Sequence, residues 1–192
     1  MVRLVWRGTP CTTFTTMQNM RRGGPLRTEK FPDGVVGLPP HQQAAVTAGN
    51  SFLRFTASIL SICRRAHIPA IVENPHASGL WRHPVLAPVW KWKETKQFVV
   101  DYCAYGTPWR KRTRLLAVWA DLSQSSRRCQ GSCGMCSFTG KPHVRLQGRS
   151  PGQGDRTKLA EAYPKAWCKA LVRDLVIALR TDELRALSRY LD

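Results

Sequence analysis

The stretch at residues 69–75, Pro-Ala-Ile-Val-Glu-Asn-Pro, decides the fold class of this chain. Its apolar run is short and bounded by prolines, which is typical of a buried strand. The preceding residues 41–66 carry apolar positions at helical intervals and end near Arg64 and Arg65, where cations suit the helix dipole. A helix that leads into a buried strand predicts an α/β fold. Glu73 then lies at the carboxyl end of a strand, where open α/β sheets bind ligands.

Further strands are predicted on both sides of this unit. Residues 3–6 read as a strand that leads directly into Thr9-Pro10-Cys11. Residues 97–102 and 115–119 read as two strands joined through a basic segment, with a turn at the Gly-Thr-Pro of residues 106–108. Residues 16–40, between the Pro-Cys segment and the predicted helix, are rich in Gly, Pro and Arg. They predict a long loop, either functional or simply solvated.

The last third of the chain changes character twice. Residues 123–155 are rich in Ser, Gly, Arg and Cys and lose periodicity, whereas residues 157–192 predict helices. Pro164 suits the start of the main helix, and Asp182 suits the cap of a separate final one. The composition therefore predicts three segments: 1–122, which contains the predicted strands; 123–155, a Cys/Gly-rich segment; and 156–192, a helical segment.

The charge balance favours a polyanionic partner. Thirty Lys and Arg residues stand against twelve Asp and Glu, which gives a formal net charge of +18. Such an excess attracts nucleic acid without sequence specificity, because each neutralised phosphate releases counterions. The alternatives are a genomic bias towards Arg codons and a non-physiological reading frame. The basic charge supports nucleic acid as the partner but does not identify it.

Seven cysteines, an odd number, argue against a disulfide framework. Residues 1–57 show no secretory leader, and the sequence contains no apolar run long enough to cross a membrane. The sequence therefore predicts an intracellular, reducing setting and no membrane partner.

Four residues in the Cys/Gly-rich segment have the types and approximate spacing of a tetrahedral zinc site. They are Cys129, Cys133, Cys136 and His143. Three cysteines within eight residues together with a histidine are unusual in a reducing compartment, so we predict structural zinc with all four positions filled. The alternative is a thiol-rich disordered linker.

Three motifs, taken in order, carry a resemblance to a known family. Residues 8–15 contain a Pro-Cys followed by a polar residue, an aromatic residue and a hydroxyl residue. Residues 71–75 end a strand in Glu-Asn, and residues 105–114 place a Tyr-Gly-x-Pro turn before an Arg-x-Arg. In this combination the chain resembles the second half of the catalytic domain of a cytosine-5 DNA methyltransferase. Pro75, Trp109 and one extra residue before the Arg-x-Arg depart from the commonest family pattern and indicate a divergent branch.

The resemblance implies that residues 1–122 form a catalytic half-domain, part of a Rossmann-like methyltransferase domain. It also implies DNA as the partner, hence the nucleus in a eukaryote, and assigns roles to four residues. Cys11 is the expected nucleophile towards carbon 6 of a flipped cytosine. Glu73 is expected to hydrogen-bond the ring nitrogen and exocyclic amine, while Arg112 and Arg114 hold the base carbonyl and the nucleophile loop. The alternative is that Glu73 is an ordinary exposed carboxylate at the end of a strand.

The family's methyl donor, S-adenosylmethionine, is the expected cofactor, yet its glycine-rich loop and acidic residues have no counterpart in this sequence. The expectation is therefore a fragment, a late-starting gene model or a remnant that still binds DNA. The alternative, from a different functional class, is a non-enzymatic zinc-containing nucleic-acid-binding protein. An amino-methyltransferase is disfavoured, because Asn74-Pro75 lacks the second proline and aromatic residue that such a site uses.

Overall fold

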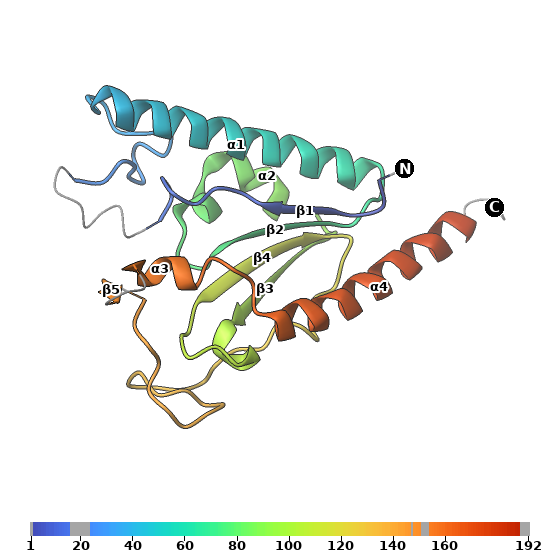
Figure 1. Cartoon of the computed structure of the whole chain (residues 1–192). Helices are drawn as coiled ribbons and strands as arrows, with labels where there is room; N and C mark the ends of the chain where they lie inside the picture. The colour runs from blue at the N-terminus through green and yellow to red at the C-terminus, as the bar shows by residue number, and fades with distance from the viewer. Residues whose placement is uncertain (1, 16–23, 147, 151–153, 189–192) are drawn as a thin grey trace. The chain divides into compact units, whose positions relative to one another are not determined.

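The structure, a computed structural model, describes residues 2–15, 24–146, 148–150 and 154–188 (Figure 1). The chain divides into two compact units. We call residues 1–97 and 115–120 the N-terminal unit, and residues 98–114 and 121–192 the C-terminal unit. The three segments predicted from composition remain a prediction. The predicted long loop lies partly outside the described residues, and its described part, residues 24–39, contains turns without helix or strand.

The N-terminal unit contains a long helix and two parallel strands. Strand β1 (Val5–Gly8) pairs in parallel with β2 (Ala70–Pro75), and helix α1 (Pro40–Arg65) connects them. The predicted helix and buried strand are confirmed, although β2 extends past Glu73 to Pro75. Three short helical turns follow β2: η2 (Gly79–Arg82), η3 (Pro84–Leu86) and α2 (Ala87–Trp90).

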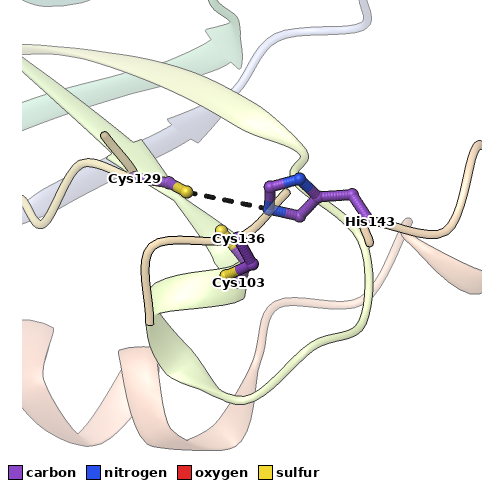
Figure 2. A group of neighbouring side chains, drawn as sticks. All are labelled: Cys103, Cys129, Cys136 and His143. Carbon is purple, nitrogen blue, oxygen red and sulfur yellow. Dashed lines mark hydrogen bonds between the residues drawn. The ribbon is translucent and has the colours of Figure 1, made fainter. Parts of the chain in front are cut away.

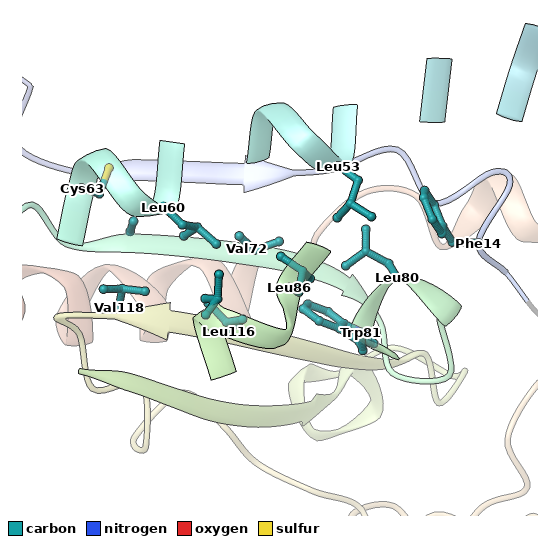
Figure 3. Packing of buried hydrophobic residues seen from close by; sticks show 12 residues of the cluster. Phe14, Leu53, Leu60, Cys63, Val72, Leu80, Trp81, Leu86, Leu116 and Val118 are labelled. Carbon is teal, nitrogen blue, oxygen red and sulfur yellow. The ribbon is translucent and has the colours of Figure 1, made fainter. Parts of the chain in front are cut away.

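The core of this unit lies where α1 packs against the sheet. Figure 3 shows side chains of α1 meeting β2, β4 and the short helical turns. Trp81 is buried in this cluster, and its indole N–H donates to the Pro75 carbonyl at 2.8 Å. Such packing stabilises α1 against the sheet through the apolar area that it removes from water. The fully buried members include Leu53, Leu60, Ala70, Val72, Leu80, Leu86, Leu116 and Val118.

Two longer strands complete a four-stranded mixed sheet with the order β1-β2-β4-β3. They are β3 (Thr95–Asp101) and β4 (Arg112–Val118), joined through the short helix η4 (Tyr102–Tyr105). The α/β fold class is thereby confirmed. Strand β4 begins three residues earlier than the predicted strand, so the basic segment from Arg112 to Arg114 belongs to a strand.

Helix α4 (Lys165–Ser188) is the last element of the C-terminal unit and begins directly after Pro164, as predicted. Before it lie β5 (Arg149–Ser150), β6 (Gly154–Asp155) and α3 (Arg156–Leu159). The buried Trp167 of α4 packs against Tyr102, with ring centroids 5.4 Å apart and the ring planes tilted by 36°. The predicted separate helix capped by Asp182 is wrong, because α4 continues through that residue without a break. None of the described helices is long and apolar enough to span a membrane.

Candidate active site and metal centre

Cys11 and Glu73 come from the same edge of the sheet. The register of the parallel pair places Gly8, the last residue of β1, opposite Glu73 in β2. Cys11 follows three residues later and is half-buried, while Glu73 is only 8% exposed. The side-chain amide of Asn74 donates to the Thr9 carbonyl at 2.6 Å and is itself buried. The residue after the predicted carboxylate therefore fastens the loop that carries the predicted nucleophile.

The segment after Cys11 is anchored by Arg27, which the sequence did not single out. Its guanidinium makes five hydrogen bonds, two of them to Thr13, and lies over the Phe14 ring at 4.0 Å. The others reach the carbonyls of Pro32 and Val46 and the side chain of Asn50 in α1. Burial lowers the pKa of Arg27 to about 10, against an opposing effect of the Asp33 charge. The guanidinium thus ties the end of the Pro-Cys loop to the long helix.

A cavity of about 460 Å³ lies beside this segment. Phe14 and His83 line it together with the charged residues Arg27, Glu29 and Arg82. S-adenosylmethionine carries a sulfonium and an ammonium against one carboxylate, whereas this lining brings two guanidinium groups against one carboxylate. Like charges in a partly enclosed space repel. The cavity therefore does not fit this cofactor.

The two predicted arginines lie on β4 in the C-terminal unit, and Arg112 has a defined partner there. Its Nε and Nη2 donate to the two carboxylate oxygens of Asp101 at 2.8 and 2.7 Å. Asp101 is fully buried. Burial raises the pKa of Asp101, but hydrogen bonds from Arg112 and from the Cys129 N–H lower it below its usual value. Arg114 is half-buried two residues further along the strand; its role towards the base carbonyl remains a prediction.

Three cysteines and a histidine gather in the C-terminal unit (Figure 2). The ligand atoms of Cys103, Cys129, Cys136 and His143 all lie within 4.8 Å of one another. Cys129 Sγ and His143 Nε2 are 3.7 Å apart, close to the roughly 3.6 Å edge of a tetrahedron built on usual zinc–sulfur and zinc–nitrogen bonds. These four residues could hold a metal ion.

Groups around the cluster favour the metal-binding forms of His143 and Cys129. His143 Nδ1 lies 2.9 Å from the Gly134 carbonyl, which can only accept, so Nδ1 carries the proton and Nε2 presents its lone pair to the cluster. Burial acts to raise the pKa of Cys129, yet hydrogen bonds from the hydroxyl and N–H of Ser137 and from the Gly131 N–H lower it to about 6. Since metals bind the thiolate, this environment favours coordination.

The predicted ligand set is corrected at one position. Cys133 is exposed, has a φ of 50° at a turn and is not part of the cluster, whereas Cys103 is buried within it. Cys103 lies in η4, where the chain turns after β3, so the fold brings it to the other three from 26 residues before Cys129. The only sequence signal for Cys103 is a single cysteine at the end of a predicted strand, shortly before the turn at Gly106. That signal is weak without knowledge of the fold.

Comparison of the chain with family models, with curated proteins and with solved structures finds no match. The functional argument therefore depends on the geometry of these residues.

Proposed function

We propose that this chain is a cytosine-5 DNA methyltransferase-like protein, in which Cys11 attacks the base and Glu73 assists. The observation that carries the proposal is the parallel register of Gly8 with Glu73, which brings the Pro-Cys loop and the carboxylate to one sheet edge. Carboxyl ends of strands are where α/β sheets bind ligands. The Asn74 bond to Thr9 supports it further, since a nucleophile needs a fixed backbone.

The chemistry assigned to these two residues is addition to carbon 6 of cytosine. The Cys11 thiolate forms the sulfur–carbon bond at C6, and the π electrons of the C5–C6 bond move to C4–C5. The π electrons of the C4–N3 bond move to N3, which takes up a proton. The Glu73 carboxyl is the group that we assign to deliver this proton and to accept a hydrogen bond from the exocyclic amine. The base must first leave the duplex stack, at a cost of about a few kcal/mol. Because the cavity does not fit S-adenosylmethionine, the residues assigned here act on the cytosine ring alone.

A covalent trapping experiment tests the proposal. The probe is a DNA oligonucleotide in which 2-pyrimidinone replaces one cytosine, a base that is more electrophilic at carbon 6 and needs no methyl donor. We expect a denaturation-resistant adduct whose peptide mass spectrum places the modification on Cys11. Absence of an adduct under conditions where the protein binds the oligonucleotide, or an adduct on another cysteine, would overturn the proposal.

Glu73→Gln is expected to slow formation of this adduct by about 10²- to 10⁴-fold, the usual range for losing a general acid or base. The amide can still hydrogen-bond the ring but cannot release a proton to N3. The measurement is the rate of trapping at saturating oligonucleotide. A matched control is Glu29→Gln, which changes a cavity-lining carboxylate outside the assigned pair and should leave the rate within threefold. Equal rates for Glu73→Gln and the unmodified protein would contradict the assigned role.

For the C-terminal unit we propose that the metal is zinc with a structural role. Three thiolates and one imidazole are the donors that zinc prefers in closed tetrahedral sites. Cys103 and Cys136 are both buried, which suits a site with no open position for water. The ion would then link the turn after β3 to the Cys-rich segment.

The second candidate function is a non-enzymatic, zinc-containing protein that binds nucleic acid. The Cys3His cluster together with the net charge of +18 favours it. This alternative predicts salt-dependent DNA binding without any covalent adduct, so the trapping experiment separates the two.

A further inference from the structure

The Asp101 carboxylate contacts two parts of the C-terminal unit at once. Its Oδ2 atom accepts from Arg112 Nη2 at 2.7 Å and from the backbone N–H of the metal-cluster residue Cys129 at 2.8 Å. The guanidinium also reaches the Cys129 carbonyl at 3.4 Å. The Asp101–Arg112 ion pair therefore holds Cys129 at both its backbone N–H and its carbonyl oxygen.

Asp101 also fixes the chain that enters the cluster from the other side. It is the last residue of β3, and Cys103 follows two residues later. The Asp101 N–H donates to the Arg127 carbonyl at 2.9 Å, and the next N–H, that of Tyr102, donates to the Lys111 carbonyl at 3.2 Å. Both approaches to the cluster, at Cys103 and at Cys129, thus depend on the position of this one residue.

We propose that Asp101 is a positioning residue that couples metal binding at the Cys3His cluster to the Arg112 end of strand β4. The coupling rests on the metal site proposed above. A partner that orients a ligand is typically worth about a factor of 10 to 100 in metal affinity. Because coupling between two binding events is reciprocal, a bound metal must hold the Asp101–Arg112 pair more firmly in turn. Arg112 would then serve the metal centre, and of the two predicted arginines Arg114 would be the one assigned to the base.

The test compares zinc affinity among full-length variants by competition with a chromophoric chelator, without DNA. Asp101→Asn keeps the size of the side chain but removes the charge that pairs with Arg112, and we expect its zinc affinity to fall by about 10- to 100-fold. Asp174→Asn is the matched control. Asp174 is a buried carboxylate of the same unit that accepts from the N–H and hydroxyl of Ser125, outside the metal cluster. Its loss should leave zinc affinity within threefold.

A spectroscopic readout separates positioning from ligation. With Co²⁺ as the probe, Asp101→Asn should still give the absorption bands of a tetrahedral thiolate site at saturation, but at higher cobalt concentration. Zinc affinity equal to that of the unmodified protein, or an equal fall in Asp174→Asn, would overturn the coupling. If Asp101→Asn does not fold with saturating zinc, Arg112→Gln decides instead: weaker zinc binding supports the coupling and unchanged binding overturns it. Failure of the unmodified protein to bind zinc would overturn the metal site itself.

Discussion

Replacing Cys11 by serine is expected to abolish the covalent adduct with the 2-pyrimidinone oligonucleotide altogether. A serine hydroxyl is a far weaker nucleophile than a thiolate, and no base that would activate it is assigned at this loop. The Asn74 bond to the Thr9 carbonyl involves main-chain oxygen and should persist in the variant, so the loop keeps its place. Affinity for the oligonucleotide, measured by anisotropy at one fixed salt concentration, should change by less than threefold.

Cys168→Ser provides the matched control for this experiment. Like Cys11, Cys168 is a half-buried cysteine, but it lies in α4 and outside the metal cluster. Its replacement should leave trapping unchanged. If Cys168→Ser abolished the adduct and Cys11→Ser did not, the assignment of the nucleophile would be wrong.

Removing the metal is expected to unfold much of the C-terminal unit. Apparent binding free energies of structural zinc in small zinc-binding peptides are about 10–16 kcal/mol at neutral pH, which exceeds the stability of many whole domains. Hydrogen exchange before and after chelation is the measurement. Amides around Cys103 and Cys129 should lose protection. Those of α1 from Leu53 to Cys63, where one face of the helix is buried, serve as the internal reference and should keep it.

The corrected ligand set gives this experiment a paired control. Cys133→Ser changes an exposed cysteine that the structure places outside the cluster, so the protein should still bind one equivalent of zinc. Cys103→Ser removes a buried member of the cluster and should reproduce the effect of chelation. The reverse result would restore the set that spacing alone predicts and would contradict the cluster in Figure 2.

The elements that the sequence predicts well are those with a strong local pattern. Helix α1 and strand β2 were found within one or two residues of their predicted starts because apolar periodicity and proline boundaries act over short distances. The cap predicted at Asp182 failed for the opposite reason. An acidic residue in a helical pattern can either cap or lie within a helix, and only the continuity of α4 decides between them.

The candidate sites show the same difference between local sequence patterns and contacts that depend on the fold. The nearness of the Pro-Cys loop to Glu73 involves two strands that the sequence predicts, although β1 begins and ends two residues later than predicted. The pairing of Arg112 with Asp101 and the membership of Cys103 in the cluster depend on contacts between separate segments, which no spacing rule contains. Arg112 illustrates the difference: a motif assigned it to the base, and the fold gives it a buried carboxylate.

The position of Cys103 also bears on how the protein is made. His143 is translated about 40 residues after Cys103, so at typical synthesis rates roughly two to eight seconds separate them on the ribosome. During that interval the first thiol of the cluster leaves the ribosome without its last partner. If the cluster holds zinc, as proposed above, its assembly requires reduced thiols and zinc around the nascent chain, and a shortage of either would act before synthesis is complete.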